Sequence, residues 1–180
     1  KGKTFVTSGP MISLKVNGRP IGDILELKSG DWVTLEAEVN APYNKYPIDV
    51  FEIVHNGKVV ASIENTQQES ILSIRKKIKL NGSAWFAARA HGEKILPYND
   101  IWKLFEPMTV AAHTSPIYVD IDGKRIWSED DAAYLISRCD MAIDWAKNTA
   151  SFHTGEQRKE VVELYEKAKS VYLNRGKLDL

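Results

Sequence analysis

The sequence is poor in cysteine and has no excess of charge of either sign. Cys139 is the single cysteine among 180 residues, which excludes an internal disulfide framework and a cysteine-rich zinc site. Lysine and arginine together number 24, and aspartate and glutamate together also number 24. Because a protein that binds nucleic acid usually has a basic excess, this balance argues against nucleic acid as a partner.

Long hydrophobic runs are missing too. No apolar stretch approaches the ~18 residues that indicate a membrane-spanning helix, so we expect no membrane partner. Hydrophobic residues still make up 43% of the chain and charged residues 27%, which is typical of a globular protein. The chain has no initiator methionine and no signal peptide, and strand-like sequence begins almost at once. We therefore expect a piece of a longer protein, and its compartment stays open.

Local motifs for catalysis are also missing. The chain has four histidines, which are His55, His91, His113 and His153. None of them has the H-x-H, H-x-x-x-H or H-E-x-x-H spacing of a zinc motif, and there is no G-x-S-x-G elbow or phosphate-binding glycine loop. A metal site assembled from His91 and His113 with Asp120 or Asp122 stays open, although ordinary strands also bring such residues near one another.

Four tight-turn signals divide the first two thirds of the chain. They are Asn17-Gly18, Asn56-Gly57, Asn81-Gly82 and Asp122-Gly123. Asn-Gly and Asp-Gly favour the positive φ angles of a two-residue hairpin turn. Between them, residues 32–40 and 71–80 alternate apolar and polar side chains, as strands with one wet face do. We predict a mainly β fold in which residues 1–127 form an antiparallel, immunoglobulin-like β-sandwich.

The polar face of residues 71–80 carries a basic row that includes Arg75, Lys77 and Lys79. Such a row serves either as a nucleic-acid patch or as the solvated face of a sheet. No aromatic residue of the segment interleaves the charges, which favours the solvated face.

The turn signal at Asn81-Gly82 determines a register for the strands that flank it. In a two-residue hairpin, Ile74 would face Arg89, which places the Arg89 guanidinium on the apolar face. A buried guanidinium needs an acidic partner, and Glu52 is the candidate. Arg89 and Glu52 are therefore predicted to form a buried ion pair. The alternative is that Arg89 anchors a substrate.

Residues 111–119, AAHTSPIYV, place His113 inside an apolar run. The neighbouring residues are typical of a strand, and Pro116 indicates an edge or a bulge. We predict that His113 is a structural, hydrogen-bonded histidine. The alternative is an enzyme centred on His113 and Arg89, in which the imidazole acts as a base.

The pattern changes at residue 128. Ser128 with Asp131 matches the start of a helix, and apolar residues then recur at helical spacing. Thr154 with Gln157 repeats the signal. We predict a helical pair over residues 128–180 that packs on the sandwich as one structural unit, with its apolar stripes serving as core or as interface.

Residues 92–108, GEKILPYNDIWKLFEPM, are unusually apolar for a connection between strands. The segment either covers the end of the core or forms a docking surface that a missing partner buries. The residues of this candidate docking surface are Tyr98, Ile101, Trp102, Leu104 and Phe105.

Three stretches together carry a family resemblance. They are GKTFVTSGPMISLKVNG at 2–18, GSAWFAARA at 82–90 and AHTSPIYV at 112–119. In order and spacing they resemble the C-terminal region of the CehA/McbA-type metallohydrolases, which are carbaryl-hydrolase-like enzymes of the polymerase-and-histidinol-phosphatase (PHP) superfamily. The helical stretches YLISRCDMAIDW and LYEKAKSVYL are similar to the end of those proteins, so the resemblance spans nearly the whole chain.

The resemblance implies an N-terminal PHP-type catalytic domain in the same polypeptide. There, histidines and acidic residues beginning with an H-x-H motif hold divalent metal, and none of those ligands maps onto this chain. The chain itself is then a non-catalytic accessory domain that packs against the catalytic domain and shapes its substrate entrance. It is expected to contribute no catalytic residue and to bind no cofactor.

The alternative is a free-standing binding module, for example for carbohydrate. Sandwich modules bind sugars through exposed aromatic rings. The candidates for such rings are Tyr43, Tyr46, Tyr98 and Trp102.

Overall fold

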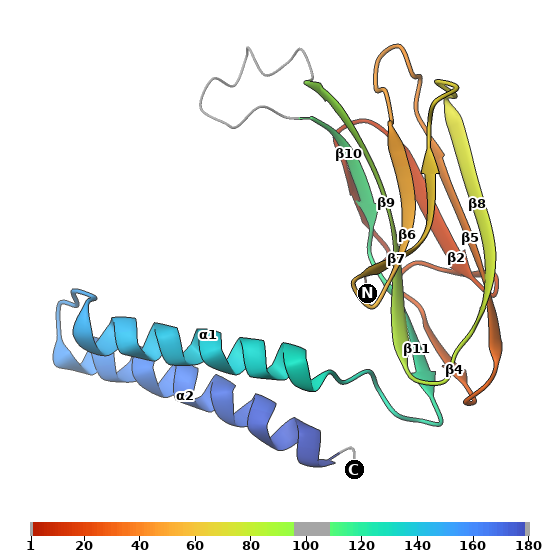
Figure 1. Cartoon of the computed structure of the whole chain (residues 1–180). Helices are drawn as coiled ribbons and strands as arrows, with labels where there is room; N and C mark the ends of the chain where they lie inside the picture. The colour runs from red at the N-terminus through yellow and green to blue at the C-terminus, as the bar shows by residue number, and fades with distance from the viewer. Residues whose placement is uncertain (1, 96–108, 179–180) are drawn as a thin grey trace. The chain divides into compact units, whose positions relative to one another are not determined.

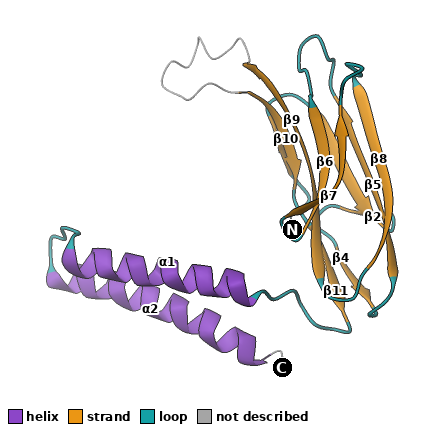
Figure 2. Ribbon diagram, viewed as in Figure 1, coloured by secondary structure: helices purple, strands orange, loops and turns teal. Residues whose placement is uncertain are grey.

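The computed structural model describes residues 2–95 and 109–178 and divides the chain into two compact units, Lys1–Ile126 and Trp127–Leu180 (Figure 1). The first unit consists of strands and the second of helices (Figure 2). The division lies one residue before the boundary predicted at 127/128. That the helical pair packs on the sandwich stays a prediction.

In its described residues, the first unit is a β-sandwich of a seven-stranded and a four-stranded sheet. The seven-stranded sheet contains β1 (Phe5–Thr7), β4 (Ile24–Leu27), β6 (Val50–His55), β7 (Lys58–Glu64), β9 (Ala84–Ile95), β10 (Thr109–Thr114) and β11 (Ile117–Ile121). The four-stranded sheet has the order β3 (Arg19–Pro20), β2 (Met11–Val16), β5 (Trp32–Asn40) and β8 (Ile71–Lys79). The predicted mainly β sandwich is confirmed.

Strand β9 organises the seven-stranded sheet. It pairs with β6 along one edge and with β10 and then β11 along the other. Beyond them, β1 pairs with β10 and β4 pairs with β11. The β4–β11 pair is parallel, so it departs from the antiparallel pairing of the other described strands.

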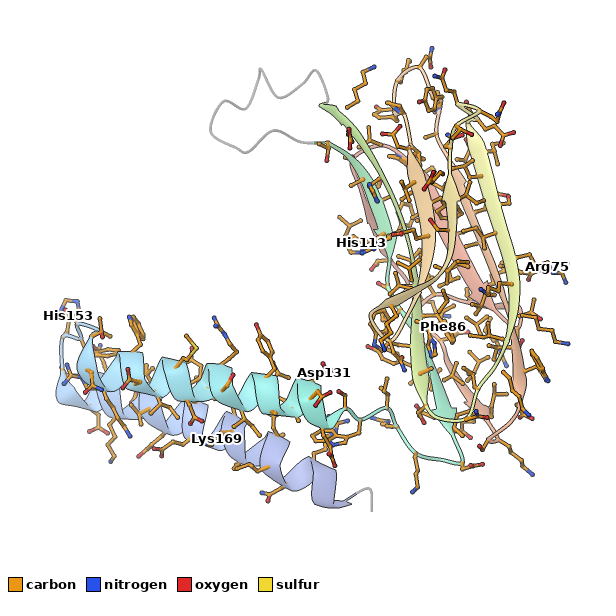
Figure 3. The ribbon with its side chains drawn as sticks, in the orientation of Figure 1. Arg75, Phe86, His113, Asp131, His153 and Lys169 are labelled. Atoms are coloured by element: carbon orange, nitrogen blue, oxygen red, sulfur yellow. The ribbon has the colours of Figure 1, made fainter. Side chains whose placement is uncertain are left out.

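The core lies between the two sheets and follows the predicted alternation. In β5 the inward residues Val33, Leu35, Ala37 and Val39 are buried, while the polar residues between them face outward. Phe86 on β9 lies inside the sandwich, whereas Arg75 on β8 points away from it (Figure 3). Because successive strand residues point to opposite faces, each sheet has one buried face and one outer face.

Three of the four predicted tight turns are present. Asn17, Asn56 and Asp122 have φ angles of 49°, 48° and 53°, and the glycine after each also has a positive φ. These are the left-handed conformations that a two-residue hairpin turn requires.

The hairpin predicted at Asn81-Gly82 is wrong. Strand β8 pairs with β5 in one sheet, while β9 belongs to the other sheet, so residues 80–83 cross between sheets. Leu80 explains the crossing, because its side chain is buried and its backbone bonds to Gly30 and Asp31. The proposed register of Ile74 against Arg89 is therefore wrong as well.

The second unit contains α1 (Glu129–Asn148) and α2 (Gly155–Leu178). Both predicted helix starts are confirmed, because Ser128 Oγ accepts from the Asp131 N–H at 3.1 Å and Thr154 Oγ1 accepts from the Gln157 N–H at 3.2 Å. Within the described ranges, no helix combines the length and apolar character that crossing a membrane requires.

Candidate functional site

The sequence-predicted residues Glu52, Arg89 and His113 share one row on the outer face of the seven-stranded sheet. The register places Arg89 between Glu52 on β6 and His113 on β10. Arg89 Nε donates to Glu52 Oε2 at 2.5 Å, so the predicted ion pair is present. Its predicted position on the apolar face is wrong, because Ala88 and Ala90 occupy the buried face and the Arg89 side chain is 52% exposed.

In this ion pair, Arg89 compensates the charge of a largely buried Glu52. The Glu52 side chain is 13% exposed, so without Arg89 its carboxylate would be unpaired and poorly hydrated. Because the guanidinium is half exposed to water, the pair contributes about 0–1 kcal/mol to the free energy of unfolding. Because Glu52 already engages the guanidinium, the geometry gives no support to Arg89 as a substrate anchor.

His113 is exposed and lies across from Arg89 on one side and Val6 on the other (Figure 3). Among the described residues, its imidazole makes no hydrogen bond. The prediction of a structural, hydrogen-bonded histidine is therefore not supported.

The buried polar group of this stretch is Thr114, which the sequence interpretation passed over. Arg89 on β9 pairs with His113, and Phe86 on β9 pairs with Ile117. The two β9 residues are three positions apart, whereas their partners are four positions apart, so one extra residue forms a bulge. At the bulge, Thr114 Oγ1 accepts from the buried Ala88 N–H at 3.0 Å. Pro116 lies at this irregularity, as predicted.

The histidines do not assemble a metal site. His91 lies on the outer face between Val50 and Ala111, whereas Asp120 pairs with Glu26 on another edge. Across residues 2–95 and 109–178, no group of three or more His, Cys, Asp or Glu side chains is placed to hold a metal ion. The divalent metal implied by the family resemblance therefore has no fitting set of ligands in the described chain.

His55 has a packing environment of its own. Its ring stacks on Phe86, with 4.8 Å between the ring centroids and 17° between the planes. Burial lowers the pKa of His55 below its ordinary value of 6.5, because desolvation disfavours the charged imidazolium.

Apolar side chains also gather on the outer face of the seven-stranded sheet. Register places Trp85 beside Tyr118 and Tyr118 beside Ile24, and the next row joins Val59, Val54 and Ala87. We call these residues the outer-face apolar patch: Ile24, Val54, Val59, Trp85, Ala87 and Tyr118. The exposed fractions of Ile24, Val59 and Tyr118 are 56%, 44% and 39%. The patch spans five strands, β4, β6, β7, β9 and β11.

The outer face of the four-stranded sheet is polar and hollowed. A groove of about 450 Å³ is lined by Ser13, Lys15, Glu36, Ala37, Glu38, Ser73, Ile74 and Arg75. The hollow arises because two short serines flank Glu38 in one cross-strand row, while the next row is the long-chained Lys15, Glu36 and Arg75.

The predicted basic row lies on this same face and is solvent-exposed. An aromatic residue does accompany it, from the neighbouring strand. Lys77 Nζ lies 5.6 Å from the centroid of the Trp32 ring, and Trp32 is 54% exposed. The sequence interpretation missed this contact because Trp32 is 45 positions away in the chain and becomes a neighbour through the β5–β8 register.

The other predicted binding residues divide into two groups. Tyr43 and Tyr46 are half-buried, and Tyr46 packs against the core. Tyr46 is also held tightly against Gly9, where an added Cβ would approach its ring to 2.4 Å. The candidate docking surface at Tyr98, Ile101, Trp102, Leu104 and Phe105 lies outside the described residues.

Comparison with known proteins yields little. No protein-family model and no curated protein matches the sequence. Among solved structures, a neutron crystallographic structure of a Jonesia denitrificans lytic polysaccharide monooxygenase is similar, with 16% sequence identity and a TM-score of 0.32. The match covers 59% of this chain and 62% of that chain. A likeness of this strength supports no argument about function.

Proposed function

We propose that the chain is a non-catalytic accessory domain of a PHP-type metal-dependent hydrolase. It packs against the N-terminal catalytic domain of the same polypeptide and helps to shape the substrate entrance. The outer-face apolar patch carries the proposal, because it provides a surface for such packing. The family resemblance of the sequence supports the choice of partner.

The patch has the composition of an interface. One of its two rows, Ile24, Tyr118 and Trp85, contains two of the aromatic residue types that are enriched where proteins meet. Charged pairs border it, with Arg89–Glu52 on one side and Lys3–Asp23, at 2.8 Å, on the other. An apolar centre with a polar rim is the usual arrangement of a protein–protein contact.

The first described residues also lie beside the patch. Thr4 accepts a backbone hydrogen bond from Ser115, two residues before β11, and Lys3 pairs with Asp23, next to Ile24. A catalytic domain joined ahead of these residues would therefore be tethered next to the patch. It would also be tethered away from the groove of the other sheet.

The docking test compares two polypeptides: this chain, and the same chain extended by the sequence that precedes it in its reading frame. Side-chain footprinting of Ile24 and Tyr118 should fall several-fold in the longer protein. Trp32, exposed on the other sheet, serves as the internal control and should react equally in both. Equal reactivity of Ile24 and Tyr118 in the two proteins, or a preceding sequence without a histidine-rich metal-binding motif, contradicts the proposal.

A second test concerns catalysis. The chain by itself, supplied with divalent metal, should hydrolyse neither esters nor phosphate esters. Turnover that a chelator abolishes would refute the accessory role.

A second candidate function is binding of a neutral saccharide in the groove of the four-stranded sheet. Ser13 and Ser73 offer hydroxyls that donate and accept, and Glu38 between them accepts. The lining has two cationic and two anionic side chains, so it favours a ligand without net charge. Calorimetry with neutral oligosaccharides tests this candidate. Glu38→Ala should abolish the heat, while the matched change Glu64→Ala on β7 should preserve it. A chain that releases no heat with any of them excludes the candidate.

A further inference from the structure

Two edge strands lie next to each other along one side of the sandwich. Strand β7 ends the seven-stranded sheet and β8 ends the four-stranded sheet, and residues 65–70 connect them. The outer edge of such a strand presents unpaired N–H and C=O groups, to which a strand of another molecule can pair.

The β7 edge is irregular at Val60. Ile53 pairs with Ala61, but Val54 pairs with Val59, so Val60 is an extra residue in a bulge. A bulge bends the strand and interrupts the regular row of backbone groups.

The β8 edge carries a lysine where its pattern calls for an apolar residue. Leu72, Ile74 and Ile78 point toward the core, and Lys76 occupies the same face in this alternation, directly opposite the fully buried Leu35. The Lys76 side chain nevertheless remains exposed.

The ammonium of Lys76 reaches across to the other sheet. Its Nζ donates to the Val60 carbonyl of the bulge at 2.5 Å. The lysine on one edge and the bulge on the other therefore meet at one point between the sheets.

We propose that Lys76 is an edge guard that keeps β7 and β8 from accepting a strand of a second copy of this chain. A strand added there would bury the ammonium or pull it from the Val60 carbonyl, and an unpaired buried charge is costly. Lys77 and Lys79 point to the outer face and keep their hydration in a paired sheet, so they do not supply this protection. This inference does not depend on the proposed accessory function.

The test replaces Lys76 with valine, which extends the apolar face of β8. Lys77→Val is the matched control, because it makes the same change of charge and composition one residue away on the outer face. Light scattering after size exclusion should show the Lys76→Val chain shifted from monomer to dimer or larger species, with wild type and Lys77→Val unshifted. Hydrogen exchange should show new protection along β7 and β8 in the associated species.

A second variant keeps the test decisive if Lys76→Val fails to fold. Lys76→Met retains an unbranched side chain one heavy atom shorter and removes its charge and donors, while Lys76→Arg retains the charge and the donors. If the methionine variant associates and the arginine variant stays monomeric, the result supports the proposed role of Lys76. If folded valine and methionine variants remain monomeric at every concentration at which wild type is monomeric, the proposal is overturned. The same holds if Lys77→Val associates equally.

Discussion

The sandwich and the helical unit bury their apolar residues to very different extents. In the sandwich, one core cluster joins both sheets and contains large side chains such as Phe51 and Phe86 with no exposed surface. The buried hydrophobic residues described in the helical unit are small, and they are Ala132, Cys139, Ala146 and Val162. Tyr134, Met141, Trp145 and Leu164 stay more than half exposed there.

This difference shows which forces determine each fold. The sandwich gains hydrophobic free energy roughly in proportion to the area that its two sheets remove from water. A two-helix unit with a seam of alanine-sized residues gains little in this way. Local terms therefore matter more in it, such as the Ser128 cap and the Lys169–Asp140 ion pair at 2.6 Å between the helices.

The largest expected effect is a cavity in the sandwich core. Phe51→Ala should lower the free energy of unfolding of the sandwich by about 3–5 kcal/mol, because it empties a fully buried site. Val162→Ala in α2 should cost about 1 kcal/mol, since it removes only two methyl groups from a thin seam. Urea unfolding, followed separately for each unit by hydrogen exchange, measures both. Equal losses in the two units would show that the extent of burial does not distinguish them.

The bulge in the seven-stranded sheet should give the next largest effect. Thr114→Val keeps the shape of the side chain but leaves the buried Ala88 N–H without its acceptor, which costs about 1–3 kcal/mol. Thr114→Ser retains the hydroxyl and should lose less. His113→Ala, one residue away on the outer face, should change the free energy of unfolding by no more than about 0.5 kcal/mol. Urea denaturation should therefore rank the three variants in that order. A larger loss for His113→Ala than for Thr114→Val contradicts the assignment.

Local signals in the sequence predicted the elements well. The Asn-Gly and Asp-Gly turns at 17–18, 56–57 and 122–123, the alternation of β5 and the two helix starts all depend on residues close together in the chain. The failure at Asn81-Gly82 has a physical reason. A turn dipeptide does not reveal that burial of Leu80 and its bonds to the 30–31 turn send the chain to the other sheet.

The surfaces were harder to foresee, because register creates them. The outer-face apolar patch draws only one or two residues from each of five strands, and none of those strands looks unusual alone. The predicted partner of Arg89, Glu52, is correct, whereas the predicted apolar face is not. Lys76 stands in a basic run, and its bond to Val60 emerges only when β7 and β8 are placed together.

The cap of α1 should have a moderate effect, confined to the helical unit. Ser128→Ala removes the hydroxyl that accepts from the Asp131 N–H and should cost about 1 kcal/mol. Ser128→Asp retains an acceptor at the N-terminus and should preserve stability. Hydrogen exchange of the first turn of α1 measures the loss. Faster exchange that also spreads into the sandwich strands would show that the two units do not unfold separately.

The smallest expected effect is a pH dependence located in the sandwich. Because burial lowers the pKa of His55, the unfolded chain binds more protons than the folded chain as the pH falls below 6.5. The contribution of neutral His55 to the unfolding free energy is therefore fully present above pH 6.5. It is lost as the pH falls from there toward the lowered pKa of His55 in the folded chain. His55→Gln cannot take up the proton, so the unfolding free energy of the sandwich should depend less on pH across this window than in wild type. Urea titrations on either side of 6.5 measure the difference. An equal dependence in the variant would show that the burial of His55 is not what makes the sandwich sensitive to acid.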